Sequence, residues 1–159
     1  MTPEEHIKKL MEQSKAIENL NSRILPNLVG NEAKNFFTES FQKEGFTDET
    51  LEPWQDVKRR TNPKRPDRAA ATRKILTGAT GDLGKSIEYK AEPGQVTIIS
   101  DTKGAGSDKD YAAAHNEGTT TAGRNRNVTI PKRQFIGKSA TLDRKVLEII
   151  KEEVDKVVK

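Results

Sequence analysis

The segment from Ala79 to Ser86, with the sequence ATGDLGKS, has residue types that could bind a phosphate. It fits the loose phosphate-loop pattern in which Ala replaces the first Gly, and the overlapping string TGATGDLG looks like a dinucleotide-binding turn. Such a loop works when a strand delivers it onto a helix N-terminus, where backbone N–H groups and the helix dipole meet the phosphate. One candidate function is therefore a small nucleotide-binding enzyme in which Lys85 contacts the ligand.

The residues around this segment argue against a nucleotide site. The preceding residues, Arg73–Leu76, form too short an apolar run for the buried parallel strand that the motif needs. The residues after Ser86 predict a hairpin, a glycine-rich loop and one helix, not the repeated strand–helix units of a dinucleotide fold. We therefore interpret residues 77–86 as two turns flanking Leu83, with glycines for backbone freedom at Gly78, Gly81 and Gly84.

The inventory of catalytic and metal-binding side chains is small. Cysteine is absent, which excludes disulfides, thiolate nucleophiles and most zinc sites, and the only imidazoles are those of His6 and His115. Spacing pairs His115 with neither a Ser nor a Lys, so we interpret it as a structural residue that fastens a loop or strand end. We expect no catalytic residue, no metal site and no cofactor.

The composition predicts a small core. Hydrophobic residues make up 32% of the 159 residues and charged residues 33%, whereas a typical hydrophobic fraction that also counts Gly is about 45–50%. A chain this polar is partly disordered or gains burial by assembling with copies of itself or with partners. We expect an N-terminal helical arm over residues 1–28 and one domain over residues 29–159.

The N-terminal residues and the hydropathy pattern predict a soluble protein made in the cytoplasm. The start, MTPEEH, is acidic where a secretory signal would be basic and then apolar. No run approaches the roughly 18 apolar residues of a membrane span. We therefore expect no membrane partner.

The net charge of +4 is concentrated in one segment. Residues 57–74 are predicted to be a flexible basic loop, because Pro63 and Pro66 exclude a continuous helix, although a helical turn from Asp67 through Ala71 fits the sequence. The basic residues from Lys58 to Lys74 could contact nucleic-acid phosphates, lie in a solvated loop or face an acidic neighbour. No aromatic residue is interleaved to stack on bases, so we expect only weak, sequence-independent nucleic-acid contact there. The alternative function is a basic nucleic-acid-binding module.

Apolar spacing predicts three main helices. The first begins with Thr2 as its cap and runs to Pro26, which stops or kinks it; its apolar stripe packs internally or docks on a neighbouring subunit. The second carries Phe36, Phe37 and Phe41 and ends at Gly45, with Trp54 closing over one end. The third is the C-terminal amphipathic helix, capped near Thr141, with an apolar face of Leu142, Val146, Ile149, Ile150, Val154 and Val157.

Alternating residues predict a hairpin, with strands at residues 86–90 and 95–100 joined through Pro93–Gly94. Residues 102–109 are expected to form a flexible glycine loop, followed by a short helix at Tyr111–His115 and a short strand at Val128–Ile130. The fold class is thus α+β, with a small antiparallel sheet of about four strands on a central helix and amphipathic helices at both ends.

Four sequence strings together resemble the phage virion morphogenesis family, typified by the tail-completion protein of Mu-like phages. They are Phe37–Gly45 with Trp54 downstream, KILTGATGDLGKSI at residues 74–87, YAAAHNEG at residues 111–118 and IPKRQFIG at residues 130–137. Each string is weak alone, but their order and spacing are moderately specific. The resemblance covers Ala33 to about Val158 and leaves the N-terminal helix outside.

Two of these strings can be compared residue by residue with the family's motifs. The aromatic–Ala, His, polar, Gly pattern is matched by Tyr111, Ala112, His115, Asn116 and Gly118. The Pro-Arg-Pro-Phe-Leu-Gly element is matched only at Pro131, Arg133, Phe135 and Gly137, because Gln134 and Ile136 replace Pro and Leu and Lys132 is inserted. An apolar clamp before the last helix is preserved.

The resemblance implies a non-enzymatic structural protein of a phage or prophage, for tail completion or head–tail joining. It would act in the bacterial cytoplasm during assembly and then in the virion, through tail or connector proteins and as a possible homo-oligomer. In this interpretation Leu83 and Ile87 pack inward while Lys85 points to solvent. The expected contact elements are the N-terminal helix, the Lys58–Lys74 loop and the Thr119–Asn127 loop.

Overall fold

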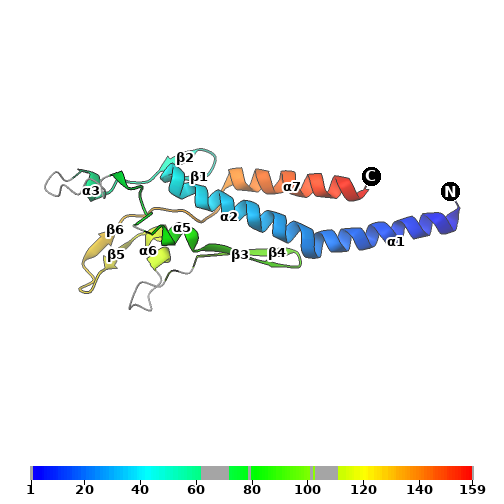
Figure 1. The fold of residues 1–159 in the computed structure, drawn as a ribbon, viewed down its shortest axis with the longest axis horizontal. Coiled ribbons are helices and arrows are strands. Elements are labelled where there is room, and N and C mark those ends of the chain that lie inside the picture. Colours follow the sequence, from blue (N-terminus) through cyan, green and yellow to red (C-terminus); the bar gives the residue numbers. More distant parts are fainter. Residues whose placement is uncertain (1, 62–71, 79, 101, 103–110, 159) are drawn as a thin grey trace.

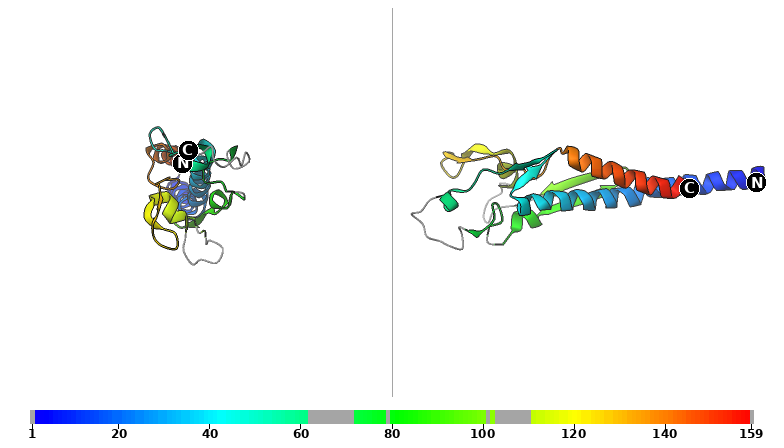
Figure 2. Two further views of the ribbon diagram at one scale, coloured as in Figure 1. Left: turned by 90° about the vertical axis from the view of Figure 1, so that its left-hand side faces the viewer. Right: turned by 90° about the horizontal axis from the view of Figure 1, so that it is seen from above.

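The protein is elongated, with a helical stalk at one end and a head of short elements at the other (Figures 1 and 2). The computed structural model describes residues 2–61, 72–78, 80–100, 102 and 111–158. The stalk consists of α1 (Pro3–Asn19), a π-helical turn (Leu20–Ile24), α2 (Leu25–Lys43) and α7 (Ala140–Val158). Helix α7 runs antiparallel to α2, and α1 extends past the C-terminal end of α7. The head contains the segments between α2 and α7.

Helix α1 begins where the sequence predicts. Thr2 is the N-cap, and a capping box joins it to Glu5: the Glu5 N–H donates to Thr2 Oγ1 at 3.2 Å and the Thr2 N–H donates to Glu5 Oε2 at 2.7 Å. Pro3 lies in the first turn, where a missing N–H has no cost. The start of the chain is thus fixed as a helix by local chemistry.

The first helix breaks before Pro26, not at Pro26 as the sequence predicts. The break is the π-helical turn, where the Leu25 N–H donates to Leu20 O, and Pro26 lies within the first turn of α2. A π turn before the proline absorbs the bend that Figure 1 shows between α1 and α2. The predicted helix end at Gly45 is close but not correct, because Glu44 adopts the left-handed C-cap conformation with φ of 52°.

Helix α2 is the centre of the core, as predicted. Phe36, Phe37 and Phe41 are all buried on one face. The Phe41 ring meets Trp54 edge-on at 5.6 Å between centroids, and it meets Phe135 at 5.2 Å. The Trp54 Nε1–H donates to Gln134 O at 2.7 Å, so the indole is satisfied while it closes over the end of α2.

The described strands form three separate two-stranded antiparallel sheets, so the prediction of one sheet of about four strands is wrong. The pairs are β1 (Gly45–Thr47) with β2 (Leu51–Pro53), β3 (Ile87–Glu92) with β4 (Gln95–Ser100), and β5 (Thr119–Ala122) with β6 (Val128–Ile130). Each pair is closed by a local turn. The β5–β6 pair is short, irregular in register and built largely of Thr, so it offers no apolar face to extend the β3–β4 sheet. The fold remains α+β.

The β3–β4 hairpin packs against α2, as its apolar alternation predicts. Gly30 of α2 allows the close approach, because a Cβ atom there would lie 2.3 Å from Tyr89 Cδ2. Ile87 is fully buried at the start of β3, and Leu83 is buried in the short helix α5 (Asp82–Lys85), whereas Lys85 is exposed. The expected inward and outward orientations of these three residues are confirmed.

Two further short helices complete the described head, α3 (Lys58–Thr61) and α6 (Tyr111–Glu117). The predicted flexible loops lie mostly at residues 62–71 and 103–110, outside the described residues, as does the predicted turn at Asp67–Ala71. Helix α7 is capped two residues before the predicted Thr141, because the Leu142 N–H donates to Ser139 Oγ at 3.2 Å. Among the described residues, no helix is long and apolar enough to cross a membrane.

Candidate functional site

Helix α1 carries apolar side chains that stay about half exposed among the described residues. We call Ile7, Leu10, Met11 and Ile17 the α1 stripe; between 49% and 59% of each residue is exposed, and α1 has no buried residue. At about 100° per residue these positions lie on one side of the helix. Most helices of this length gain their stability by burying such a face. The α1 stripe is therefore an uncovered surface of a size that a partner helix could cover.

Helix α7 has the predicted amphipathic face but buries it incompletely. Leu142 is buried and Val146 packs against the core, while Val154 is 38% exposed. Lys145 of α7 pairs with Glu32 of α2 at 2.7 Å and lies over the Phe36 ring. The helix is thus fixed to α2 near its start, and it leaves apolar side chains exposed toward its end, including Val158.

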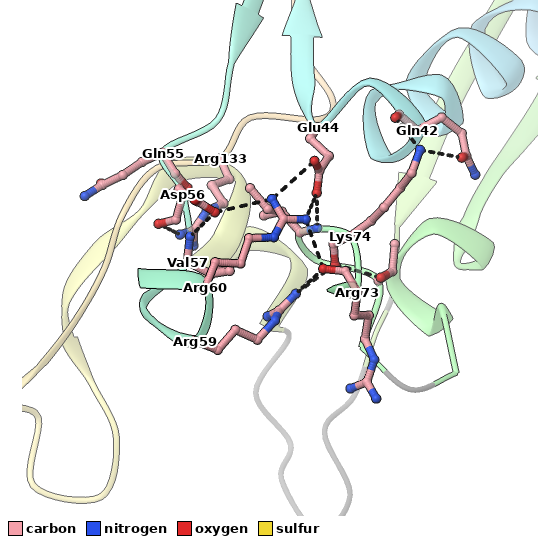
Figure 3. A network of polar contacts seen from close by, with 12 residues as sticks. Gln42, Glu44, Gln55, Asp56, Val57, Arg59, Arg60, Arg73, Lys74 and Arg133 are labelled. Atoms are coloured by element: carbon pink, nitrogen blue, oxygen red, sulfur yellow. Dashed lines mark hydrogen bonds and ion pairs between the residues drawn. The ribbon is translucent and has the colours of Figure 1, made fainter. Parts of the chain in front are cut away.

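Arg60, near the start of the basic segment, forms an ion pair within the fold. Arg60 of α3 donates two hydrogen bonds to the Glu44 carboxylate, from Nη2 to Oε1 at 2.6 Å and from Nη1 to Oε2 at 3.3 Å (Figure 3). The Glu44 carboxylate also accepts the Ile75 N–H at 2.6 Å. The hydrogen bond from Arg60 is the main reason that the pKa of Glu44 is lowered, with a smaller contribution from Ile75.

Two more basic residues of this segment hold backbone carbonyl groups. Arg59 Nη2 donates to Arg73 O at 3.0 Å and to Lys74 O at 2.9 Å, and Lys74 Nζ donates to Gln42 O at 2.7 Å (Figure 3). The Arg59 contacts join residues 58–61 to residues 72–75 at the base of the predicted basic loop, and the Lys74 contact joins the latter to α2. Arg59, Arg60 and Lys74 therefore build the head rather than forming only a solvated charge cluster. Lys64, Arg65 and Arg68 lie outside the described residues.

The described residues of the glycine-rich segment, 76–78 and 80–86, lack the geometry of a phosphate loop. Gly78 and Gly81 adopt positive φ angles, as their predicted role in turns requires, but α5 is only four residues long. Lys85 Nζ donates to Thr80 O at 2.7 Å, and Ser86 Oγ donates to Leu83 O at 2.8 Å. The two side chains that would contact a phosphate and its metal ion are thus engaged with their own backbone. Ala79 lies outside the described residues.

The third glycine of this segment has a different role from the predicted one. Gly84 does not adopt a positive φ angle, and a Cβ atom there would lie 3.4 Å from Phe41 Cδ2. Its small size lets α5 approach the α2 core. Packing, not backbone freedom, explains this glycine.

The side chain that ties the segment after α6 to residues 135–136 is Asn116, whereas the sequence predicted that His115 has this role. Its Oδ1 atom accepts two backbone N–H groups, from Phe135 at 2.9 Å and from Ile136 at 3.0 Å. His115 contributes through its backbone, since the Arg133 N–H donates to His115 O at 2.8 Å. The motif strings around residues 111–118 and 130–137 therefore meet in space. In the sequence, Asn116 is indicated only by its place in the YAAAHNEG string at residues 111–118.

Arg133 is a buried cation that bonds to neutral groups. Only 7% of the residue is exposed. Its Nε–H donates to Gln55 O at 3.0 Å, and Nη2 lies 3.4 Å from Asp56 O. Burial and the nearby charge of Arg59 lower the pKa of Arg133, and the attraction of Asp56 is too weak to reverse this.

A cavity of about 310 Å³ lies beside these two arginines. Its lining includes Arg59, Arg133, His115 and Tyr111, together with Leu76, Thr77, Gly78, Thr80 and Asp82. Leu76 has φ of 60°, an uncommon conformation for a residue with a side chain. His115 Nδ1 is buried without a hydrogen-bond partner among the described residues. No sequence motif points to this cavity, because its lining comes from four distant segments.

The predicted Thr119–Asn127 contact loop comprises strand β5 and the β5–β6 turn. Gly123 and Arg126 adopt positive φ angles there, and Arg124 is exposed. Among the described residues, no group of three or more His, Asp or Glu side chains is placed to hold a metal ion. The β5–β6 turn remains a candidate contact surface by exposure alone.

These features define a small, elongated α+β protein with a helical stalk and a polar head. The chain belongs to the phage virion morphogenesis family, whose model matches residues 4–155. That match includes the N-terminal helix, which the motif-based resemblance left outside. Searches among curated proteins and among solved structures found no match.

Family membership indicates a structural or assembly role in a phage, and it is consistent with a protein that is not an enzyme. It also implies interaction with other phage proteins and association with the virion. The sequence-based recognition of the family is thereby confirmed. The division into residues 1–28 and 29–159 stays a prediction.

Proposed function

We propose that this protein completes the phage tail or joins the tail to the head, through contacts with tail or connector proteins and with copies of itself. It assembles in the bacterial cytoplasm and remains in the virion. The observation that carries this proposal is the α1 stripe. None of the 17 residues of α1 is buried, so the helix presents an apolar surface that a partner could cover.

The stalk and the head offer different surfaces for this assembly. The α1 stripe suits another helix, because apolar side chains at helical spacing pack into the grooves of a partner helix. The head presents the exposed β5–β6 turn and the basic residues at the base of the Lys58–Lys74 segment. A tail or connector protein that contacts both ends would be held in one orientation.

Deletion of the gene from an inducible prophage tests the role directly. We expect the lysate to contain unjoined heads and tails, or tails of aberrant length, in electron micrographs. Restoring the gene in trans should restore infectious particles. Intact, infectious virions from the deletion strain would exclude an essential role in morphogenesis.

The alternative function, a basic nucleic-acid-binding module, makes a different prediction. Arg59 and Arg60 are engaged with the fold, so we expect weak binding near 50 mM salt that is largely lost at physiological strength. Tight, sequence-specific binding to duplex DNA at physiological salt would favour the alternative. Arg59 and Arg60 are the first residues to change in that case.

A further inference from the structure

The outer edge of β4 presents backbone groups that could pair with another strand. β4 pairs with β3 on one side, and among the described residues no backbone hydrogen bond joins β4 to any other element. In a hairpin with a two-residue turn, the pair that flanks the turn bonds across it, so the outward N–H and C=O groups of β4 are those of Val96, Ile98 and Ser100. A row of this kind is a template for strand addition.

β4 lacks the charges that usually protect such an edge. Its sequence, QVTIIS, contains no charged residue and four β-branched ones, whereas β3, with the sequence IEYKAE, carries three charged residues. Native proteins commonly place charged side chains or Pro on an edge strand to prevent pairing with other chains. Ile99, on the exposed face of β4, is 43% exposed. The composition of β4 therefore favours pairing with a further strand.

A groove of about 290 Å³ lies beside this edge, between β4 and the start of α2. Leu25, Pro26 and Val29 of α2 and Val96 of β4 supply apolar surface to it. No residue of β3 lines the groove, so it lies on the β4 side of the hairpin. A strand added about 4.8 Å from β4 would direct every second side chain toward α2. An apolar side chain at one of these positions would fill the groove.

The groove argues against a second copy of this chain as the added strand. In an antiparallel pair of two β4 strands centred on Ile98, the residue opposite Val96 would be Ser100 of the second copy. Ser100 is polar, and its Oγ atom lies 2.9 Å from Ser86 Oγ in its own fold. The next residue that would face inward, Thr102, is buried in its own fold. A strand with an apolar residue opposite Val96 suits the groove better.

We propose that β4 binds an extended segment of another protein as a third strand of the β3–β4 sheet, with an apolar side chain of that segment in the groove. The inference rests on the proposed function only for the source of the segment, which is another protein of the virion. Asn21, which also lines the groove, follows Ile17 of the α1 stripe by about one helical turn. A partner that covers the stripe therefore reaches the groove.

A matched pair of capped peptides tests strand addition on the intact chain. The probes are acetyl-Lys-Thr-Val-Ile-Val-Thr-Lys-amide and the same peptide with Pro in place of the central Ile, which removes an N–H donor and interrupts the strand. Titration with the Ile peptide, followed by ¹⁵N–¹H NMR, should give saturable shifts at Val96, Ile98 and Ser100. Hydrogen exchange of these three N–H groups should slow when the peptide is bound. We expect the Pro peptide to bind at least about tenfold more weakly.

Two variants with the same substitution test the groove. Val29→Asp places a charge where an apolar side chain would bind, and it should weaken binding of the Ile peptide at least about tenfold. Val128→Asp makes the same change in β6, where the residue is 49% exposed, and should change the affinity less than about twofold. The wild-type titration with the two peptides needs no variant, so it remains decisive if Val29→Asp does not fold.

Four outcomes overturn the inference. Three of them are equal binding of the Ile and Pro peptides, no saturable shift with the Ile peptide at concentrations up to about 5 mM, and equal loss of affinity in the two Asp variants. The fourth is a dimer of the chain alone in sedimentation, with protection of the Val96 and Ile98 N–H groups that rises with protein concentration, because a second copy would then occupy the edge.

The prophage deletion tests a separate claim. Infectious virions from the deletion strain, together with a β4 edge that binds the Ile peptide, would refute only the proposed function. Defective virions, together with a chain that binds neither peptide, would refute only strand addition.

Discussion

Glu44 and Arg60 form a two-point ion pair that closes the end of α2 onto the basic segment, with 2.6 Å between Glu44 Oε1 and Arg60 Nη2. Glu44 is also the left-handed C-cap of α2, and the same carboxylate accepts the Ile75 N–H. One side chain therefore connects three segments: the helix end, α3 and the residues that return from the predicted basic loop.

Glu44→Gln and Glu44→Ala should separate the charge from the hydrogen bond. Gln keeps an acceptor for the Ile75 N–H but loses the ion pair, and we expect a small loss of stability because the pair is partly exposed. Ala leaves the Ile75 N–H unpaired and should cost about 1 kcal/mol more. Urea unfolding monitored by Trp54 fluorescence measures both, and equal stabilities for the two variants would contradict this role of the carboxylate.

Asn116 is predicted to be more important for stability than His115. Asn116→Ala removes the acceptor for two partly buried N–H groups, of Phe135 and Ile136, and should cost about 2 kcal/mol. Asn116→Asp keeps the acceptor atom and should cost less. Thermal unfolding of both variants checks this order; an Asp variant as unstable as the Ala variant would mean that the amide group matters for another reason.

The sequence was sufficient where local spacing determines structure. The helix cap at Thr2, the Phe face of α2 and the alternation in β3 and β4 are all encoded by neighbouring residues, and they appear where the sequence predicts them. The number of sheets was not encoded this way, because strand pairing beyond a hairpin depends on contacts between distant segments. Packing constraints such as Gly30 against Tyr89 are equally nonlocal.

The candidate functional surfaces also differ in how far the sequence predicts them. The α1 stripe follows from helical spacing, although only the structure shows that about half of each of its residues stays exposed. Arg59 and Arg133 are separated widely in sequence, and Arg133 entered the sequence analysis only as a motif match. Their joint position beside the Leu76–Asp82 turn depends on the whole head being folded.

The α1 stripe should matter for assembly but not for the folding of the monomer. Leu10→Ser with Met11→Ser changes two exposed side chains, so the free energy of unfolding should change by no more than about 1 kcal/mol. In a prophage lacking the gene, this variant should fail to restore infectious particles. Lys9→Ser with Glu12→Ser, on the opposite side of α1, is the matched control and should restore them. Full restoration by the stripe variant would show that the uncovered apolar surface has no role in assembly.

The stability of the protein should fall as the pH falls below about 6.5, because of His115. Burial, with a smaller effect of the Arg133 charge, lowers the pKa of His115 below its ordinary value of 6.5. The unfolded chain then binds a proton at a pH where the folded chain does not, so acid favours unfolding from about 6.5 down to the folded pKa. His115→Gln should remove this part of the pH dependence, whereas His6→Gln, in the exposed first turn of α1, should retain it. Urea midpoints at pH 7.5 and pH 5.5 measure the difference. A midpoint that changes equally with pH in the His115→Gln variant and in the wild type would mean that another group causes the acid sensitivity.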